Sequence, residues 1–173
     1  MKIAFLCIAA IIVLIGSVAL IVALIGAMLP QRHVASRSAS FHAPPERLFA
    51  LISGPQDWRP DVRSCELLTQ DGRSYQREIS RRGETILYEI VQSRPPLAIQ
   101  RRVATPNLPY SGTWTFALEP GGAITRVRIT EDGEVYNPIF RFVSRFILGQ
   151  TATQDTYLSA MGKATGEDIS IDD

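Results

Sequence analysis

The residues from Ile3 to Leu29 include no charged side chain, and this run constrains the fold more than any other feature of the chain. A helix rises about 1.5 Å per residue, so the run would extend roughly 40 Å, whereas the hydrocarbon core of a bilayer is roughly 30 Å thick. A cleaved signal peptide has a shorter apolar core, of about 7 to 15 residues, and no clear A-x-A site precedes Arg32. We therefore expect residues 1–30 to form a retained membrane anchor.

The charges at the two ends of this run are few. Lys2 and the terminal amine lie on one side, and Arg32 and Arg37 lie on the other. Positively charged residues favour the cytoplasmic side of a membrane, and neither end has a clear excess. The sequence predicts a single span through residues 3–29 and does not indicate which side of the membrane holds the rest of the chain.

Beyond the anchor the charge is balanced. The chain has 18 basic and 17 acidic residues, and Lys2 is the one charged residue before Gln31, so 17 of each sign remain. Nucleic-acid binding depends on a surplus of positive charge, so we expect no nucleic-acid partner. A length of 173 residues corresponds to one ordinary domain after the anchor.

The sequence between the anchor and the last predicted helix indicates mainly strands. A polar stalk is expected over residues 31–40, passing into a first strand near Val34. The stretch HAPPERLFALIS places prolines at the start of a short helix, where their missing N–H groups cost nothing, and spaces Leu48, Leu51 and Ile52 along one face. An antiparallel meander with one apolar and aromatic face is then expected, because six alternating segments follow with turn residues between them. The segments are SCELLT, RSYQREIS, ETILYEIVQS, LAIQRRVA, GTWTFAL and AITRVRITED.

A long helix is expected to follow the meander and cover it. Asn137 and Pro138 suit an N-cap and a first helical residue, and apolar residues recur at helical intervals up to about Lys163. Gly149 and Gln150 interrupt this apolar stripe, which indicates a bend or a partly polar cavity wall. The stripe consists of Ile139, Phe142, Phe146, Tyr157 and Met161.

Two features near the C-terminus complete the prediction. Arg141 and Arg145, with Phe140, form a basic and aromatic turn at the start of the long helix. This turn either faces phospholipid headgroups or belongs to a solvated helix face. The acidic residues 168–173 are expected to form a frayed tail.

Three stretches resemble the START-like superfamily of polyketide cyclases, dehydrases and lipid-transfer proteins (SRPBCC). The resemblance covers nearly everything within residues 35–167 and implies an α+β helix-grip fold. In that fold a curved antiparallel sheet wraps around a long C-terminal helix, here preceded by one transmembrane helix. Relatives often have a second tryptophan soon after the first in the loop behind the short helices, whereas this loop has only Trp58. The stretches are HAPPERLFALISGPQDWRPDV, GTWTFALEPGGAITRVRITEDGEV and NPIFRFVSRFILGQTATQDTYLSAMGKA.

The resemblance implies an internal cavity that binds or carries a hydrophobic small molecule or lipid. The superfamily mixes carriers, sensors and enzymes, so the fold alone does not imply a reaction. We expect no cofactor and no metal, because His33 and His42 alone cannot easily build a metal site. A structural or assembly module with a filled interior is an alternative. The residues predicted to line the cavity are Trp58, Tyr88, Arg101, Trp114, Phe116, Glu131, Tyr136, Phe146, Gln150 and Tyr157.

One carboxylate bears on catalysis. By alternation, Glu131 shares the apolar face of Val127 and Ile129, and Arg101 shares the face of Ile99 two strands away. In one interpretation both lie in the cavity, with Glu131 as the acid or base of a cyclase or dehydrase and Arg101 as its electrostatic partner. In the other, Glu131 closes the open end of the sheet and Arg101 extends to water.

Overall fold

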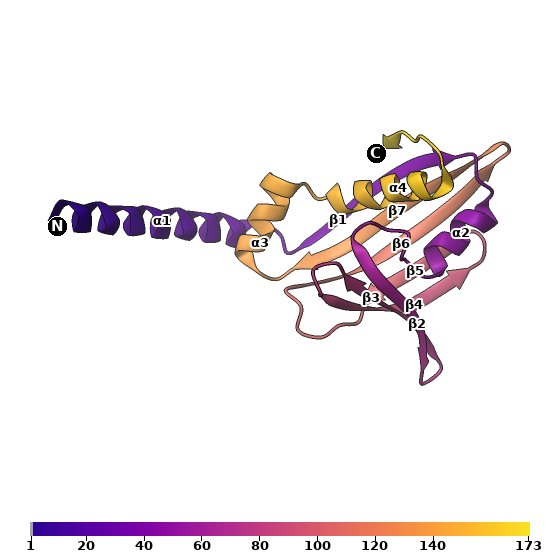
Figure 1. Cartoon of the computed structure of the whole chain (residues 1–173), viewed down its shortest axis with the longest axis horizontal. Coiled ribbons are helices and arrows are strands. Elements are labelled where there is room, and N and C mark those ends of the chain that lie inside the picture. Colours follow the sequence, from indigo (N-terminus) through magenta and orange to yellow (C-terminus); the bar gives the residue numbers. More distant parts are fainter. Residues whose placement is uncertain (1) are drawn as a thin grey trace.

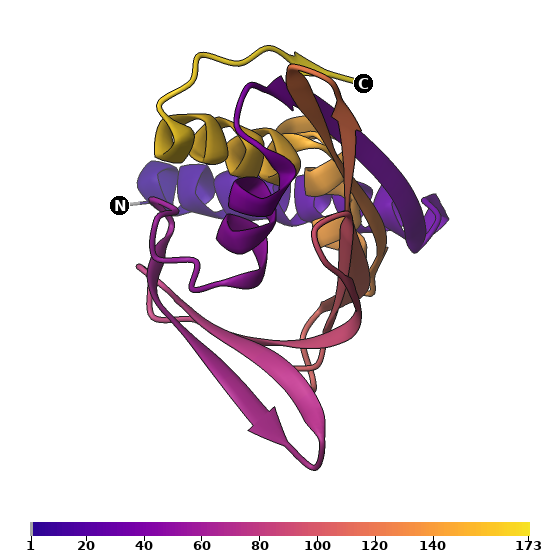
Figure 2. The same ribbon diagram turned by 90° about the vertical axis from the view of Figure 1, so that its right-hand side faces the viewer.

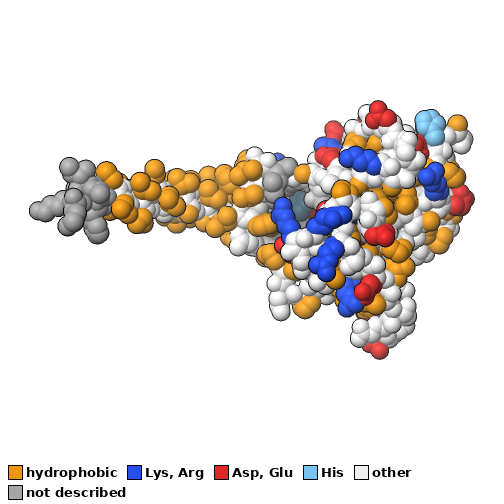
Figure 3. All heavy atoms as spheres, in the orientation of Figure 1, with side chains coloured by type: hydrophobic (Ala, Val, Ile, Leu, Met, Phe, Trp, Pro, Cys, Tyr) orange, Lys and Arg blue, Asp and Glu red, His pale blue; other side chains and the backbone are white. Residues whose placement is uncertain are grey.

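The computed structural model describes the backbone of residues 2–173 and the side chains of residues 7–147 and 149–173. Helix α1 (Lys2–Met28) projects from a domain of strands and helices, as Figure 1 shows. Its residues Cys7–Met28 are long and apolar enough to cross a membrane, and none is buried against the domain over the most apolar window. Figure 3 shows hydrophobic side chains along this helix up to its junction with the domain. Met1, which the predicted anchor includes, lies outside the described residues.

The domain is built on one eight-stranded antiparallel sheet with the order β2-β3-β4-β5-β6-β7-β1-β8. Strands β2 to β7 follow one another along the chain, which confirms the predicted meander. The strands are β1 (Arg32–Phe41), β2 (Val62–Gln70), β3 (Arg73–Ser80), β4 (Thr85–Arg94), β5 (Ala98–Val103), β6 (Tyr110–Gly121), β7 (Ile124–Val135) and β8 (Ile171–Asp172).

Alternation explains which face of the sheet is inside. Thr125, Val127 and Ile129 on β7 are buried, while the residues between them are more exposed. The turns follow local chemistry as well, since Asp71 and Gly72 take φ values of 50° and 72° between β2 and β3. Positive φ at both central residues is typical of a tight hairpin turn whose twist matches that of the strands.

The sheet curves around two helices, as Figure 2 shows. Helix α2 (Pro45–Ser53) has proline in its first turn, as predicted, and buries Leu48, Phe49 and Ile52. Helix α4 (Ala152–Thr165) buries Tyr157 and Met161 against the same core. The core therefore lies between the concave face of the sheet and these two helices.

The predicted long closing helix is divided. It comprises α3 (Pro138–Val143), the π-helical turn η1 (Ser144–Leu148) and α4. Asn137 caps α3, because its Oδ1 accepts a hydrogen bond from the Phe140 backbone N–H over 3.1 Å. Gly149, at φ 80°, ends η1, and this position lies within the interruption that predicted a bend. Of these three segments, α4 covers the core, whereas α3 packs against α1. The expectation of one continuous covering helix is therefore wrong.

The predicted stalk is shorter than expected, and the predicted frayed tail contains a short strand. Only Leu29, Pro30 and Gln31 separate β1 from α1, because the strand expected near Val34 already begins at Arg32. The tail pairs with the other edge of β1, where Ile171 lies opposite Ala39. Both segments are ordered because β1 offers hydrogen-bonding partners on each side.

Candidate ligand-binding cavity

An open cavity of about 700 Å³ lies between the curved sheet and the helical segments α3, η1 and α4. Strands β1 to β7 all contribute residues to one wall, and the residues around the break at Gly149 supply the other. Most of the wall that the strands contribute is apolar or aromatic. These residues are Val62, Ile86, Tyr88, Val103, Tyr110, Trp114 and Val135.

The cavity has a charged side formed by Arg59, Asp61 and Glu78. Arg59 lies in the loop between α2 and β2, and Glu78 lies on β3, which faces that loop. Arg59 and Glu78 are buried, with 9% and 5% of their surfaces exposed. A ligand in the cavity would contact an apolar wall and, at this side, a paired arginine and carboxylate.

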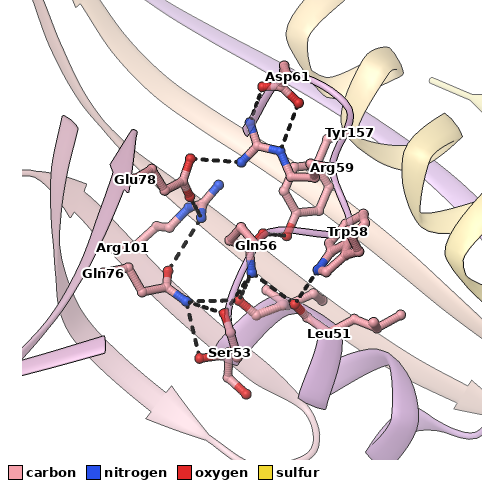
Figure 4. A network of polar contacts seen from close by, with 12 residues as sticks. Leu51, Ser53, Gln56, Trp58, Arg59, Asp61, Gln76, Glu78, Arg101 and Tyr157 are labelled. Carbon is pink, nitrogen blue, oxygen red and sulfur yellow. Dashed lines mark hydrogen bonds and ion pairs between the residues drawn. The ribbon is translucent and has the colours of Figure 1, made fainter. Parts of the chain in front are cut away.

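Figure 4 shows the network that holds these charges. Glu78 accepts a hydrogen bond from Arg59 Nη1 over 2.9 Å and another from Arg101 Nη1 over 3.0 Å. Arg59 also donates to both oxygens of Asp61, at 3.3 and 2.5 Å. Two arginines and two carboxylates thus neutralise one another, which is what buried charges require. The net effect of Glu78 and Asp61 is to raise the pKa of Arg59 against the lowering effect of burial.

Two glutamines complete this network at the end of α2. Gln56 Nε2 donates to the carbonyls of Leu51 and Ile52, and Gln76 Nε2 donates to those of Ile52 and Ser53. The last carbonyls of a helix have no partner within the helix, so these amides satisfy them. The Tyr157 hydroxyl then donates to Gln56 Oε1 over 2.8 Å, which ties α4 to the same loop. The loop that positions Arg59 is therefore rigidly held.

Arg101 is enclosed by aromatic rings. Its guanidinium carbon lies 4.7 Å from the centre of the Tyr88 ring, 5.0 Å from that of Phe116 and 5.7 Å from that of Trp114. A cation over an aromatic face is attracted by the ring quadrupole, and the attraction grows when water is excluded. Arg101 does not line the cavity but supports Tyr88 and Trp114, which do.

Glu131 lies on β7 directly opposite Trp114 on β6, and both line the cavity. The carboxyl is partly buried, and burial raises its pKa above the ordinary value of 4.5 despite the opposing influence of His33. His33, on β1, also lines the cavity. Glu131 is therefore a partly buried carboxyl that faces the cavity.

The structure places the predicted site residues in three groups. Tyr88, Trp114, Glu131 and Gln150 line the cavity. Trp58, Phe116 and Tyr157 instead form an aromatic part of the core, with ring centres 5.3 Å apart for Trp58 and Tyr157 and 5.1 Å apart for Phe116 and Tyr157. The exposed side chains among them are Tyr136 and Phe146.

The predicted proximity of Arg101 and Glu131 is not observed among the described side chains. Trp114 on β6 pairs with Arg101 on β5 and with Glu131 on β7, so it lies between the two. Arg101 donates hydrogen bonds to Glu78 and Gln76 instead. The alternative in which Arg101 extends to water is also wrong, because only 3% of its surface is exposed. Its partner comes from β3, on the opposite side of β5 from Glu131.

Sequence reasoning missed Arg59, Glu78, Tyr110 and Phe140, all of which line the cavity. Strand β3, RSYQREIS, has polar residues on both faces, so alternation did not show that Gln76 and Glu78 point inward. Gln76 and Glu78 are two positions apart and therefore share a face of the strand, but no local pattern indicates that this face is the buried one.

The family described as polyketide cyclase / dehydrase and lipid transport matches residues 32–159, the part of the chain that forms the sheet, the cavity and the start of α4. The chain belongs to this family. The predicted helix-grip fold is confirmed, since the curved sheet, the covering C-terminal helix and the similar solved structures agree. Among curated proteins, none matches this sequence significantly.

Solved structures with the same fold come from different organisms. A START superfamily protein from Mycobacterium smegmatis is 17% identical, with a TM-score of 0.62 over 78% of this chain and 97% of its own. Norcoclaurine synthase from Thalictrum flavum is 14% identical, with a TM-score of 0.59 over 79% and 88%. A protein from Arthrobacter aurescens is 14% identical, with a TM-score of 0.56 over 77% and 86%. At these identities the likeness shows the shared fold.

Proposed function

We propose that this protein is a membrane-tethered domain that binds or carries a mostly apolar small molecule or lipid in its cavity. The observation that carries the proposal is the cavity of about 700 Å³, in which an apolar and aromatic wall meets the buried pair Arg59 and Glu78. Ligand pockets are commonly about 300 to 1,000 Å³, mainly apolar, with a few fixed polar groups that orient the ligand. The expected ligand therefore has an apolar body and at least one hydrogen-bonding group.

The tether is α1. Its span Cys7–Met28 has 22 residues, which corresponds to about 33 Å of helix and matches the roughly 30 Å of a hydrocarbon core. The full chain should remain in the membrane pellet after carbonate extraction, because a spanning helix inserts almost irreversibly. Release into the supernatant would indicate that α1 is a cleaved signal or only a peripheral contact.

A filled interior was the expectation for a purely structural module. The cavity argues against that alternative, since open space lined partly by charged residues takes the place of a filled apolar interior. A small molecule would occupy this space.

One observation favours a second candidate function, a reaction of the cyclase or dehydrase type. Glu131 lines the cavity, and burial raises its pKa, as is common for groups that exchange protons with a substrate. Arg101 has no part in this candidate, because it does not line the cavity. If Glu131 is catalytic, Glu131→Gln should retain a bound ligand but stop its conversion, whereas a pure carrier should show no conversion in the parent.

Native mass spectrometry of the full chain in detergent micelles tests the binding proposal. The parent should retain a small molecule or lipid as a discrete added mass. Val103→Trp places bulk in the cavity and should lose that mass, while Val91→Trp, on a partly exposed valine of the neighbouring strand, should keep it. Equal retention by both variants, or no added mass in the parent, would contradict cavity binding.

A further inference from the structure

Helix α3 is fixed to the end of α1 by close backbone contact. A Cβ atom added to Gly26 would lie 1.9 Å from the carbonyl oxygen of Pro138, so only glycine permits this approach. Arg141 Nη1 donates a hydrogen bond to the Leu29 carbonyl over 2.6 Å. Arg141 is buried, which corrects the expectation of a solvated helix face at this position. The orientation of the domain relative to α1 is therefore set at this junction.

This junction lies at the depth of the membrane surface if α1 spans. The apolar span ends at Met28, so Gly26 lies within one helical turn of its end. Pro138 touches Gly26, and α3 must lie at about the same level. A helix held at that level meets the boundary between headgroups and acyl chains.

The outward face of the α3–η1 segment, residues 138–148, suits that boundary. Four large apolar side chains of the segment have between 47% and 67% of their surfaces exposed, and one of them, Phe140, also borders the cavity. Exposing them to water is unfavourable, whereas the headgroup and acyl boundary accepts apolar side chains a few ångströms deep. The four are Ile139, Phe140, Phe146 and Ile147.

A groove of about 290 Å³ leads from the end of α1 to the cavity. It begins at Leu29 and Pro30 and shares His33, Ser144 and Gln150 with the cavity lining, so the two spaces adjoin. The part of the cavity lined by His33, Ser144 and Gln150, called its mouth below, thus lies beside the point where the chain leaves the apolar span.

The lining of the groove is basic. It includes three arginines, and no carboxylate is among the described residues that line it. The Nε of Arg141 is buried and has no hydrogen-bond partner among the described atoms. Arginines at this level favour the phosphate groups of lipids, which carry negative charge. The three are Arg32, Arg141 and Arg145. Arg32 forms an ion pair with Asp132, whereas Arg141 and Arg145 donate to neutral acceptors, the Leu29 carbonyl and Gln150 Oε1.

We propose that the α3–η1 segment lies in the headgroup and acyl boundary of the membrane that α1 spans, so that the mouth of the cavity opens at the bilayer surface. This placement rests on the proposed tether and adds the orientation of the domain. A ligand dissolved in the bilayer then reaches the cavity through the groove without crossing water.

Depth-dependent fluorescence quenching tests this placement in the full chain. Native Cys7 and Cys65 are replaced by alanine and serine, and one cysteine is introduced at a time and labelled with an environment-sensitive fluorophore. The reporters are Phe146→Cys on the segment, Gln150→Cys at the mouth and Leu67→Cys on the distant β2–β3 hairpin, while a fourth chain keeps Cys7 in α1. The chains are reconstituted into vesicles of phosphatidylcholine and phosphatidylglycerol, with and without lipids that carry a nitroxide quencher near the glycerol. Phe146 is exposed, so its replacement leaves the core unchanged, and circular dichroism checks the fold.

The labels at Cys7 and Phe146 should lose more than half of their fluorescence, Gln150 should lose less, and Leu67 should be unchanged. Quenching at Cys7 without quenching at Phe146 would overturn the placement while the tether stands. Quenching at Phe146 with Gln150 unchanged would overturn the position of the mouth. Equal quenching at Leu67 would mean that the whole domain lies on the membrane without this orientation. No quenching at Cys7 would overturn the tether itself, and the placement with it.

Discussion

Arg101 on β5 donates a hydrogen bond from Nη1 to Glu78 on β3 over 3.0 Å, and both side chains are buried. The second oxygen of Glu78 accepts from Arg59, so one carboxylate holds two guanidinium groups. Arg101 supports the aromatic wall of the cavity, and Arg59 forms part of its charged side. This shared carboxylate therefore couples the stability of the fold to the shape of the cavity.

Replacing Glu78 with glutamine should strongly destabilise the domain. The change leaves Arg101 buried without a counter-charge, and breaking a buried ion pair in this way costs about 3–5 kcal/mol. The melting temperature of the full chain in detergent, followed by tryptophan fluorescence, should fall by roughly 10 °C. Glu66→Gln removes an exposed ion pair with Arg77 and should change the melting temperature little. Similar melting temperatures for the two variants would show that Glu78 is not essential to the fold.

Alanine substitutions at Trp114 and Phe116 should have different effects on ligand binding and on stability. Phe116 is fully buried, so Phe116→Ala should cost about 3–5 kcal/mol of unfolding free energy. Trp114 is only partly buried because it faces the cavity, and Trp114→Ala should cost about 2 kcal/mol while releasing more ligand. Melting curves and the fraction of chain with added mass in native mass spectrometry measure the two effects. Greater loss of ligand in the Phe116 variant, at a temperature where both variants are folded, would contradict the assignment of Trp114 to the wall.

Glu131→Gln should become relatively more stable as the pH rises. Because burial raises the pKa of Glu131 in the folded state, the folded chain keeps this proton at a pH where the unfolded chain has lost it. The stabilising contribution of the group is complete below its ordinary value of 4.5 and is lost as the pH rises through the raised pKa. The melting temperature of the variant minus that of the parent should therefore be larger at pH 7 than at pH 4. A gain that is larger at pH 4 would mean that the carboxylate is stabilised in the folded chain.

Gly26→Ala should loosen the α1–α3 junction. The added methyl group would meet the Pro138 carbonyl, and overpacking of this kind costs about 1–3 kcal/mol. Hydrogen exchange measured by mass spectrometry in detergent should accelerate in peptides that cover residues 138–148. Gly16→Ala is the matched control, since nothing lies within 4 Å of its added Cβ atom. Unchanged exchange in the Gly26 variant would show that the two helices are not packed together in solution.

Several elements of this protein follow from local sequence alone. The uncharged run from Ile3 to Leu29 predicts one long apolar helix, and α1 is that helix. Alternation predicted the strands of the meander and the inward face of Val127 and Ile129, because the side-chain period of a strand depends only on its backbone. The turn residues between the strands are equally local.

The course of the chain at its two ends depended on tertiary contacts. The first strand begins at Arg32 rather than near Val34, because the residues before Val34 also find partners on β7. Residues 168–173 lack a strand pattern, yet Ile171 and Asp172 pair with β1, because β7 occupies only one edge of that strand. The closing helix divides at Gly149, where α3 turns away from the sheet to pack against α1. A contact between Gly26 and Pro138, 112 positions apart, cannot be predicted from either segment alone.

Within the site, the sequence determined which residues face inward on most strands, and the tertiary structure decided which of them meet. Tyr88, Trp114 and Glu131 all line the cavity. Arg101 also points inward, but its partner is Glu78 because β3 and β5 flank β4 and the curved sheet brings their inner faces together. Alternation specifies the side of a strand on which a residue lies. The partner of a long charged side chain depends on which opposite charge the curved sheet brings within reach, because a charge removed from water needs a counter-charge.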